Sequence, residues 1–409
     1  MRRALVARLG MAALVCGPAV ASAKNYKLTL EQALALARER APEVVIEGAR
    51  VREVEAQRVG ASVLLRENPE IEGAAGRRRS EAGESWTDVE AAVTQMFEVG
   101  GKRGARIAMA DAATASARSR ADDAGRRAQL EVAVSFLRAL HARERVRVAE
   151  ASAASLDATR RAMERRAQKG DVAALEVNLA ASASVRARAA VLARQAEADE
   201  LLAVVAAHLG LGADDTIELA GTLEAGPALS TEALLRRAAV RPDVAALLGE
   251  ERAGQAEERL GRAMRWPDLG VRGSYAREGE EDVILGGLVI RLPLFDRGQE
   301  ARATGRARTA RARAERRFLT AGIARDIRVG SERRAKLEQA LALLRDEAVP
   351  ILEDSEKLLA RSVETGLIGL GDYLAARREL LAAREEYLDR LLDVAIAGVE
   401  LDLGAGGRP

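Results

Sequence analysis

The chain carries one pattern twice, offset by about two hundred residues. The signals of the first half return in the second half in the same order. An internal repeat of this length indicates one structural unit that is used twice. We therefore expect a pseudo-symmetric fold in which neither half closes its own core. The matching segments are 28–42 (LTLEQALALARERAP) with 229–242 (LSTEALLRRAAVRP), 68–71 (NPEI) with 266–269 (WPDL), 97–100 (FEVG) with 295–298 (FDRG), and 170–176 (GDVAALE) with 366–372 (GLIGLGD).

The N-terminus has the pattern of a secretory signal. Three arginines precede a short apolar run at 9–20, and Ala-Ser-Ala follows at 21–23. This order predicts a signal peptide over 1–23 that is removed from the mature protein. The alternative is a membrane anchor, but the apolar run is short for a bilayer span. Lipidation of Cys16 is disfavoured because Val15 is a poor residue for that processing.

The composition excludes several classes of site. Cys16 is the only cysteine, so the mature chain is expected to have neither a disulfide framework nor a thiolate metal site. The two histidines, His141 and His208, stand alone in helical stretches and favour a packing role over metal ligation. A net charge of +2 with 31% charged residues argues against a nucleic-acid partner. We predict no catalytic residues, no metal site and no cofactor.

Most of the chain is rich in Ala, Arg, Glu and Leu, which is typical of long helices. Residues 102–168 contain no proline, and apolar residues recur there at spacings of three and four. Such a helix would be roughly 100 Å long. It is stable only if a stripe along its length is buried against partner helices.

The partners of the long helix are predicted in the same repeat. Two shorter helices, placed end to end, match it in length. The second half repeats this arrangement, with Pro350 expected to kink or break its long helix. The predicted helices are 43–67, 102–168 and 171–209 in the first repeat, and 243–265, 299–364 and 371–400 in the second.

Glycines mark one end of the long helices. Gly170 and Gly366 are expected to end them and to begin tight turns at about 169–172 and 365–371. The sequence thus divides into the signal peptide and two repeats. The repeats cover 24–220 and 221–409.

Four segments near the other end of the helices are predicted to be strands, at 69–76, 86–97, 267–276 and 283–294. Each is about as long as a tilted membrane-spanning strand. Apolar and polar residues alternate in them, and Trp86, Trp266 and Tyr275 lie near predicted strand ends. An ordinary hairpin with one buried face would alternate in the same way. Four strands cannot close a barrel with a lumen, so a membrane role requires several copies of the chain.

The order of these elements resembles that of the TolC-type outer-membrane efflux channels, also called outer membrane factors. The resemblance covers essentially the whole mature chain. Each local motif is weak, but their repetition in this order is specific. The motifs are LTLEQALALA at 28–37, the proline-led strand starts at Pro69 and Pro267, FEVGGKRGAR at 97–106 and GLIGLGDYLAARRELLAA at 366–383.

This resemblance implies a mainly α fold with a small β part. Four strands from each chain of a homotrimer would form a twelve-stranded barrel in contact with outer-membrane lipid. The helices would form a coiled-coil tunnel that extends into the periplasm of a Gram-negative cell. Such a protein is not an enzyme. It passively conducts substrates delivered by an inner-membrane resistance-nodulation-division pump and a periplasmic adaptor protein.

Within that family, the compact length, the short loops and FEVGGKRGAR look most like the heavy-metal cation efflux branch. A multidrug channel or a type I secretion conduit is the alternative inside the family. A periplasmic coiled-coil scaffold or adaptor is the alternative outside it. The isolated hairpin in each repeat favours a channel, because an adaptor would carry a compact domain of many strands.

The resemblance also implies roles for individual residues. Asp372 corresponds to an acidic ring at the periplasmic constriction, which would favour cations. Its repeat equivalent, Glu176, is expected to lie on a solvated face. Glu90, Arg272 and Arg291 are possible lumen-facing residues, with cross-strand pairing as the alternative. The tip turns are expected to dock the adaptor, at Gly170, Glu176, Gly366, Gly369 and Gly371.

Two further expectations concern the gate and the strand-to-helix connection. Val363 and Ile368 stand where polar or aromatic gate residues would be expected, which favours an apolar or acidic constriction. In FEVGGKRGAR, the glycines favour a backbone bend. Its basic residues, Lys102, Arg103 and Arg106, are interpreted as a solvated helix start near lipid headgroups.

Overall fold

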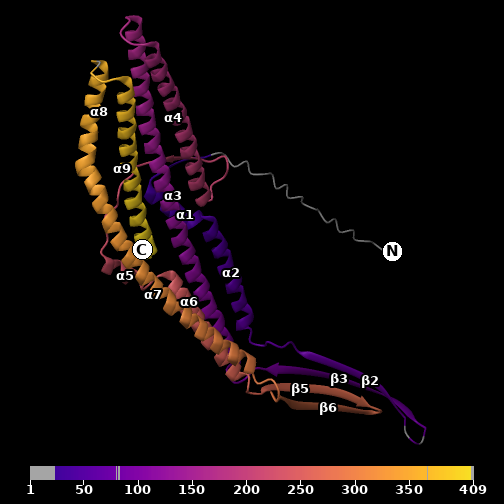
Figure 1. Ribbon diagram of the computed structural model, residues 1–409. Coiled ribbons are helices and arrows are strands. Elements are labelled where there is room, and N and C mark those ends of the chain that lie inside the picture. The colour runs from indigo at the N-terminus through magenta and orange to yellow at the C-terminus, as the bar shows by residue number, and fades with distance from the viewer. Residues whose placement is uncertain (1–23, 80, 82, 366, 407–409) are drawn as a thin grey trace, which may run out of the picture.

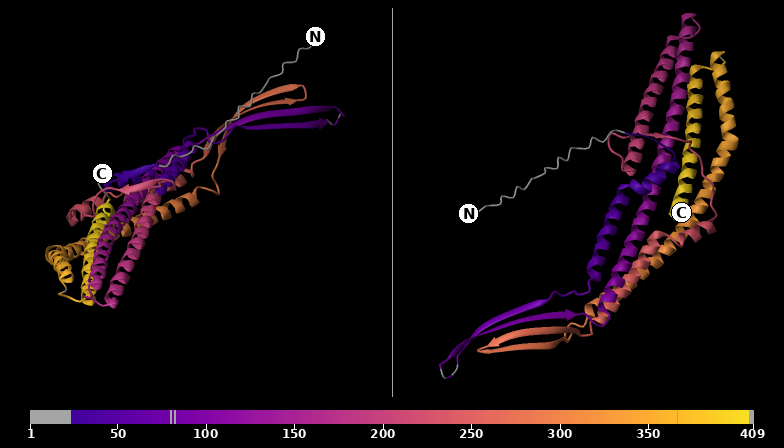
Figure 2. Two further views of the ribbon diagram at one scale, coloured as in Figure 1. Left: turned by 90° about the horizontal axis from the view of Figure 1, so that it is seen from above. Right: turned by 180° about the vertical axis from the view of Figure 1, so that it is seen from behind.

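The computed structural model describes residues 24–79, 81, 83–365 and 367–406. The predicted signal peptide 1–23 and Gly366 lie outside the described residues. The molecule is elongated, with a bundle of helices that ends in a four-stranded sheet (Figure 1 and Figure 2). The prediction of a mainly α fold with a small β part is confirmed. No described helix combines the length and the apolar character needed to cross a bilayer.

One helix runs through most of the first repeat. It is α3 (Lys102–Gln168), with α2 (Pro42–Ser62) beside its strand-proximal half and α4 (Ala174–His208) beside the other half. The two shorter helices are therefore stacked along the long one, as Figure 1 shows. Helix α2 ends five residues before the predicted end at 67, because the chain leaves the helix at Val63 to approach the first long strand.

The second repeat has the same plan with an interruption. Helix α6 (Pro242–Ala263) lies beside α7 (Gln299–Leu343), and α9 (Leu370–Gly404) lies beside α7 and α8 (Val349–Glu364). The helical path predicted over 299–364 is present, and it is interrupted next to Pro350, as expected.

A five-residue π-helical turn, η1 (Leu344–Ala348), separates α7 from α8. Pro350 explains the interruption. It has no N–H to donate to the carbonyl four residues earlier, and its ring would clash with that carbonyl. Widening the turn to a π-helix relieves both problems without ending the helical path.

Glycines bring α6 and α7 unusually close together. Gly254 packs on Gly305, and Gly261 packs on Gly298, so that an added Cβ at any of these positions would lie within 3.0 Å of the neighbouring backbone. Gly254 and Gly261 are seven residues apart along α6, and Gly298 and Gly305 are seven residues apart at the start of α7. This spacing keeps the two glycines on one helix face. Beside this contact, arginines of α7 pair with glutamates of α6 in a ladder: Arg306 with Glu258, Arg308 with Glu257, Arg311 with Glu250, and Arg313 with Glu251.

The four long strands form one antiparallel sheet in the order β2-β3-β5-β6. The two hairpins thus meet through β3 and β5, with Val93 opposite Gly273. At the hairpin loops the strands are longer than predicted. At the other end of the sheet, β6 stops before the predicted end at 294, so Leu292 and Leu294 lie beyond the sheet. The strands are β2 (Glu70–Arg79), β3 (Ser85–Phe97), β5 (Asp268–Glu278) and β6 (Glu281–Arg291).

Four short elements lie against the middle of the helical bundle. Strands β1 (Asn25–Leu28) and β4 (Thr216–Leu219) pair in parallel, and α1 (Leu30–Arg40) and α5 (Thr231–Ala238) follow nearby. None of these elements was assigned from the sequence. The largest buried cluster lies here, where the strand pair and α1 cover the middle of α3. Its members include Leu28, Val132, Phe136, Leu209 and Leu219.

Candidate functional site

One face of the four-stranded sheet is apolar and uncovered. Strand register places Ile71, Val93, Val271 and Leu288 on the same face. Their side chains are exposed, Leu288 by 83%. A continuous exposed apolar surface of this kind marks contact with a membrane or another protein.

The opposite face carries the charged residues that were predicted to face a lumen. Arg272 Nη2 lies 2.8 Å from Glu72 Oε2 and 3.5 Å from Glu90 Oε1. Arg291 Nη1 lies 2.5 Å from Glu67 Oε1, across the sheet in the first repeat. The structure thus places Glu90, Arg272 and Arg291 on the face opposite the apolar one, and each of them takes part in an ion pair between segments. The face is charged, but its charges neutralise one another.

The corner between β3 and α3 is a packed junction. Gly100 and Gly101 have φ of +75° and +81°, and Trp266 occupies the space where a Cβ of Gly100 would lie. Lys102 Nζ lies 2.8 Å from Asp268 Oδ1, and both side chains are largely buried. The bend explains the glycines.

The headgroup interpretation of the basic residues at this corner is wrong for Lys102 and Arg106. Arg106 is also buried, and its Nη1 lies 2.5 Å from Glu98 Oε1. Both cations are held by carboxylates inside the junction, because a buried charge is stable only with a partner. Arg103 instead donates to the backbone carbonyl of Ser62, which fixes the end of α2.

The turn after α3 depends on one glycine. Gly170 has φ of +82°, and the N–H groups of Gly170 and Asp171 donate to the carbonyls of Ala167 and Arg166. This is the usual glycine-terminated helix end. In the second repeat, Gly369 has an ordinary φ of −68°, and a Cβ on Gly371 would meet nothing within 4 Å. The fold of one chain therefore requires glycine at 170 but gives no reason for Gly371.

Glu176 and Asp372 occupy equivalent positions. Each is the third residue of its helix, and the N-cap residues Ala173 and Gly369 have similar extended dihedrals. A carboxylate in the first turn interacts favourably with the helix dipole. Asp372 is exposed and makes no hydrogen bond or ion pair with any described residue, whereas Glu176 is half-buried. The Glu176 carboxylate likewise has no partner among the described residues, so greater exposure is what distinguishes Asp372.

The tip has its own small core. Val363, Leu370 and Tyr373 of the second repeat pack with Met163 and Ala180 of the first. Val363 is only 5% exposed and Ile368 packs against this cluster, so these side chains hold the two hairpins together and do not form an exposed apolar surface. Because Val363 is buried within one chain, of the two expected kinds of constriction an acidic one fits this position better than an apolar one.

Tyr373 joins the two repeats by a polar contact that the sequence analysis missed. Its side chain is 3% exposed, and its hydroxyl lies 3.0 Å from Thr159 Oγ1 and 3.4 Å from Ser155 Oγ. It directly follows Asp372, so the contact determines where the N-terminus of α9 lies relative to α3. The signal available in the sequence was the tyrosine itself, because a buried tyrosine packs its ring in a core and its hydroxyl usually finds a hydrogen-bond partner.

Replacing Tyr373 by Phe should loosen this tip contact. The phenyl ring still fills the core, but the hydroxyls of Thr159 and Ser155 lose their shared partner, which costs about 0.5–1.5 kcal/mol. We expect faster backbone amide hydrogen exchange in residues 155–163 and 370–377 and unchanged exchange in β3 and β5. Unchanged exchange at the tip would show that apolar packing alone positions α9.

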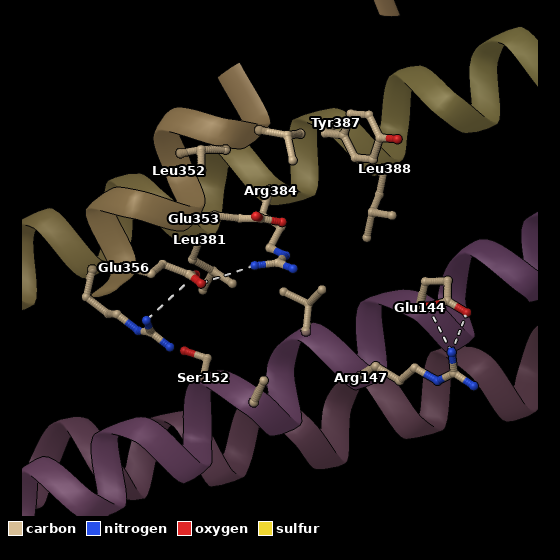
Figure 3. A pocket seen from close by; sticks show the side chains of 14 residues that line it. Glu144, Arg147, Ser152, Leu352, Glu353, Glu356, Leu381, Arg384, Tyr387 and Leu388 are labelled. Atoms are coloured by element: carbon tan, nitrogen blue, oxygen red, sulfur yellow. Dashed lines mark hydrogen bonds and ion pairs between the residues drawn. The ribbon is translucent and has the colours of Figure 1, made fainter. Parts of the chain in front are cut away.

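A cavity of about 360 Å³ lies between α3, α8 and α9, directly beyond the π-helical turn (Figure 3). Leucines such as Leu381 and Leu388 line it together with Tyr387. Its charged residues are largely paired, with Glu356 Oε2 3.2 Å from Arg384 Nη1, and Arg147 Nη1 3.0 Å from Glu144 Oε1.

The two histidines connect helices. His141 Nε2 lies 2.8 Å from Asp389 Oδ1, between α3 and α9, and burial lowers the pKa of His141 below its usual value. His208 Nδ1 lies 3.2 Å from Ser135 Oγ. Within the part of the chain that the structure describes, no three His, Cys, Asp or Glu side chains are grouped closely enough to hold a metal ion.

Known proteins share both the fold and the sequence pattern. The sequence profile of the family described as "Outer membrane efflux protein" matches residues 233–407. In its second repeat the chain is thus similar to outer membrane efflux proteins. Such proteins are channel components of tripartite efflux systems. This chain is an outer-membrane efflux channel whose helices extend into the periplasm.

Two curated relatives and one solved structure illustrate the relationship. The cobalt-zinc-cadmium resistance protein CzcC of Cupriavidus metallidurans is 26% identical over 75% of this chain and 74% of its own length. The nickel-cobalt-cadmium resistance protein NccC of Alcaligenes xylosoxydans xylosoxydans is 28% identical over 75% of this chain and 69% of its own. The structure of CusC aligns with a TM-score of 0.74 at 16% identity, over 93% of this chain and 92% of CusC.

Proposed function

We propose that this efflux protein conducts heavy-metal cations. The observation that carries the proposal is the similarity to CzcC and NccC, whose names both record resistance to cobalt and cadmium. The structure contributes a free carboxylate at the tip, Asp372, in a position where several copies of the chain would bring such groups together. The channel itself would be passive, and an inner-membrane resistance-nodulation-division pump and a periplasmic adaptor would deliver the cations.

Growth of a strain that lacks this gene tests the proposed substrate. We expect reduced growth in graded zinc, cobalt, cadmium or nickel and unchanged growth in lipophilic drugs, with the intact gene restoring metal resistance. Sensitivity to drugs alone would contradict the metal proposal and favour the multidrug alternative. Protein release from outer membranes by carbonate washing would instead favour a periplasmic scaffold.

The working form that we propose is a homotrimer. The edge strands β2 and β6 each pair with only one described strand, and the apolar face of the sheet is exposed. Pairing β6 of one copy with β2 of the next satisfies both edges, and three copies give a closed ring of twelve strands. In that ring the apolar face would contact lipid and the charged face would line the interior. The mass of the detergent-solubilised complex, measured by light scattering, tests this assembly.

The tip turns are the proposed docking sites for the adaptor. Small residues at Gly170, Gly369 and Gly371 leave room for a close approach by another helix, and nothing within one chain requires Gly371 to be small. Gly366, which lies outside the described residues, belongs to the same predicted surface, and Glu176 lies on its first-repeat side. Replacing Gly371 by Leu should therefore weaken adaptor binding while the channel still assembles.

Replacing Asp372 by Ala should weaken the preference for cations. A ring of carboxylates attracts cations to a constriction, and alanine removes that charge while retaining the helix. We expect a lower ratio of cation to anion permeability in reversal-potential measurements on single channels in a salt gradient. Glu353→Ala, which removes an exposed carboxylate of α8, serves as the control. An unchanged permeability ratio in Asp372→Ala would remove Asp372 from the proposed constriction.

A further inference from the structure

A second cavity is lined by residues of α2, α3, α6 and α7 and of the segment after α2. These helices come together close to the sheet, as Figure 1 shows. The volume of the cavity is about 650 Å³. Alanines, Gly60 and Met109 form much of its lining, and its charged residues are mostly arginines. They are Arg66, Arg106, Arg120, Arg308 and Arg311, with Glu250 as the one acidic lining residue. We propose that this cavity binds a phosphate-type anion.

The strongest observation is an incompletely paired arginine. Arg106 lines the cavity and is only 6% exposed. Its Nη1 is paired with Glu98, but its Nε and Nη2 have no hydrogen-bond partner among the described residues. A guanidinium presents five N–H donors, and leaving buried donors unpaired is unfavourable. An anion in the cavity would supply the missing acceptors.

The remaining arginines outnumber the carboxylates on the cavity surface. Glu250 pairs with both Arg120 and Arg311, the latter at 2.7 Å, and Arg311 also pairs with Glu315, which is outside the cavity lining. Arg308 Nη1 lies 3.0 Å from Glu257 Oε2, which is outside the cavity lining. Arg66 has no carboxylate partner within the described ranges. The cavity surface thus presents more guanidinium than carboxylate groups.

The arginine-rich lining favours a phosphate group over a simple monovalent anion. Guanidinium forks match the oxygens of a phosphate, and several such contacts can form at once around its tetrahedron. Arg106 and Arg120 come from α3 of the first repeat, and Arg308 and Arg311 come from α7 of the second, so one bound phosphate would tie the repeats together near the sheet. The cavity is also within the usual size range of ligand sites.

Two sources supply this chemistry. One is free inorganic phosphate. The other is the phosphomonoester headgroup of a lipid, which is available if the neighbouring sheet lies in the membrane as we propose. The binding site itself does not depend on which cations the channel conducts, so the metal-resistance experiment and the binding experiment fail independently.

The test is binding by the full-length protein in detergent. Isothermal titration with inorganic phosphate at constant ionic strength should give saturable binding, with chloride as the comparison anion. In a second arm, the protein in nanodiscs of phosphatidylcholine should gain thermal stability when phosphatidic acid is added. Binding of phosphate identifies the free anion as a ligand, and stabilisation by phosphatidic acid alone identifies the headgroup.

Matched variants locate the site. Arg308→Gln combined with Arg311→Gln should weaken binding at least tenfold, because both side chains line the cavity. The two arginines also pair with Glu257 and Glu250, so circular dichroism of the double variant must show parent-like helix content. Arg317→Gln, on the same helix but outside the cavity, should bind as the parent protein does. Absence of saturable binding in both arms, or an equal loss in Arg317→Gln, overturns the proposal.

Discussion

Replacing Asp268 by Ala should strongly destabilise the junction between the sheet and the helices. Asp268 accepts from Lys102 Nζ at 2.8 Å and from the backbone N–H of Val99 at 3.3 Å. Alanine would leave the ammonium of Lys102 buried without its partner, and breaking a buried ion pair in this way costs about 3–5 kcal/mol. The loss should appear as a lower midpoint of heat unfolding, followed by circular dichroism in detergent.

Two further variants separate the ion pair from a general effect of charge. Glu281→Ala removes an exposed carboxylate from the far end of the second hairpin, and we expect its unfolding midpoint to stay within the error of the parent. Combining Asp268→Leu with Lys102→Met removes both charges and should recover most of the loss, since replacing both buried partners by apolar groups is often nearly neutral. A double variant as unstable as Asp268→Ala would show that Asp268 acts mainly through the backbone of Val99.

Replacing Gly305 by Val should separate α6 from α7. The added Cβ would lie within 3.0 Å of the backbone of Glu258 and Gly254, which cannot move like a flexible side chain. The helices must shift apart, and overpacking of this kind costs about 3 kcal/mol or more when backbone is involved. The same shift would strain the arginine–glutamate ladder on either side. We expect a lower unfolding midpoint and a smaller yield of assembled channel in outer membranes.

The matched control lies on the same helix. Gly322 is also in α7, but an added Cβ there meets nothing within 4 Å. Gly322→Val should therefore be neutral or slightly stabilising, since valine has a better helix propensity than glycine. Equal destabilisation by both substitutions would mean that the helix itself, and not its contact with α6, is sensitive to valine.

The elements that follow from local pattern were predictable. The absence of proline and the spacing of apolar residues indicated the helix at 102–168, and α3 has these bounds. Alternation indicated the strands, because side chains of a strand point to opposite faces in turn. The strand ends were less predictable, since Arg77 and Arg78 read as loop residues but pair with Thr87 and Trp86 in the hairpin.

The short parallel strands β1 and β4 were missed for a different reason. Each has four residues, and they lie about 190 residues apart in the chain. So short a segment has no detectable periodicity of its own, and its pairing depends on where the helices place it. The heptad spacing of Gly254 with Gly261, and of Gly298 with Gly305, was a readable signal for close helix packing.

The candidate site was located more reliably than it was interpreted. The repeat alignment placed Glu176 and Asp372 at equivalent positions, and both are third residues of their helices. However, the sequence does not show which charged residues of a segment are exposed and which are buried. Lys102 and Arg106 belong to the buried junction, although their sequence context resembles a solvated helix start.

By itself, the sequence determined the repeat, the long helices, the paired hairpins and the resemblance to efflux channels, because each follows from periodicity or order along the chain. Only the tertiary structure decided which residues are partners. The ion pair of Lys102 with Asp268 and the contact of Tyr373 with Thr159 each join different repeats. Such contacts depend on how the helices cross in space, and a local pattern contains no information on the residue that lies opposite.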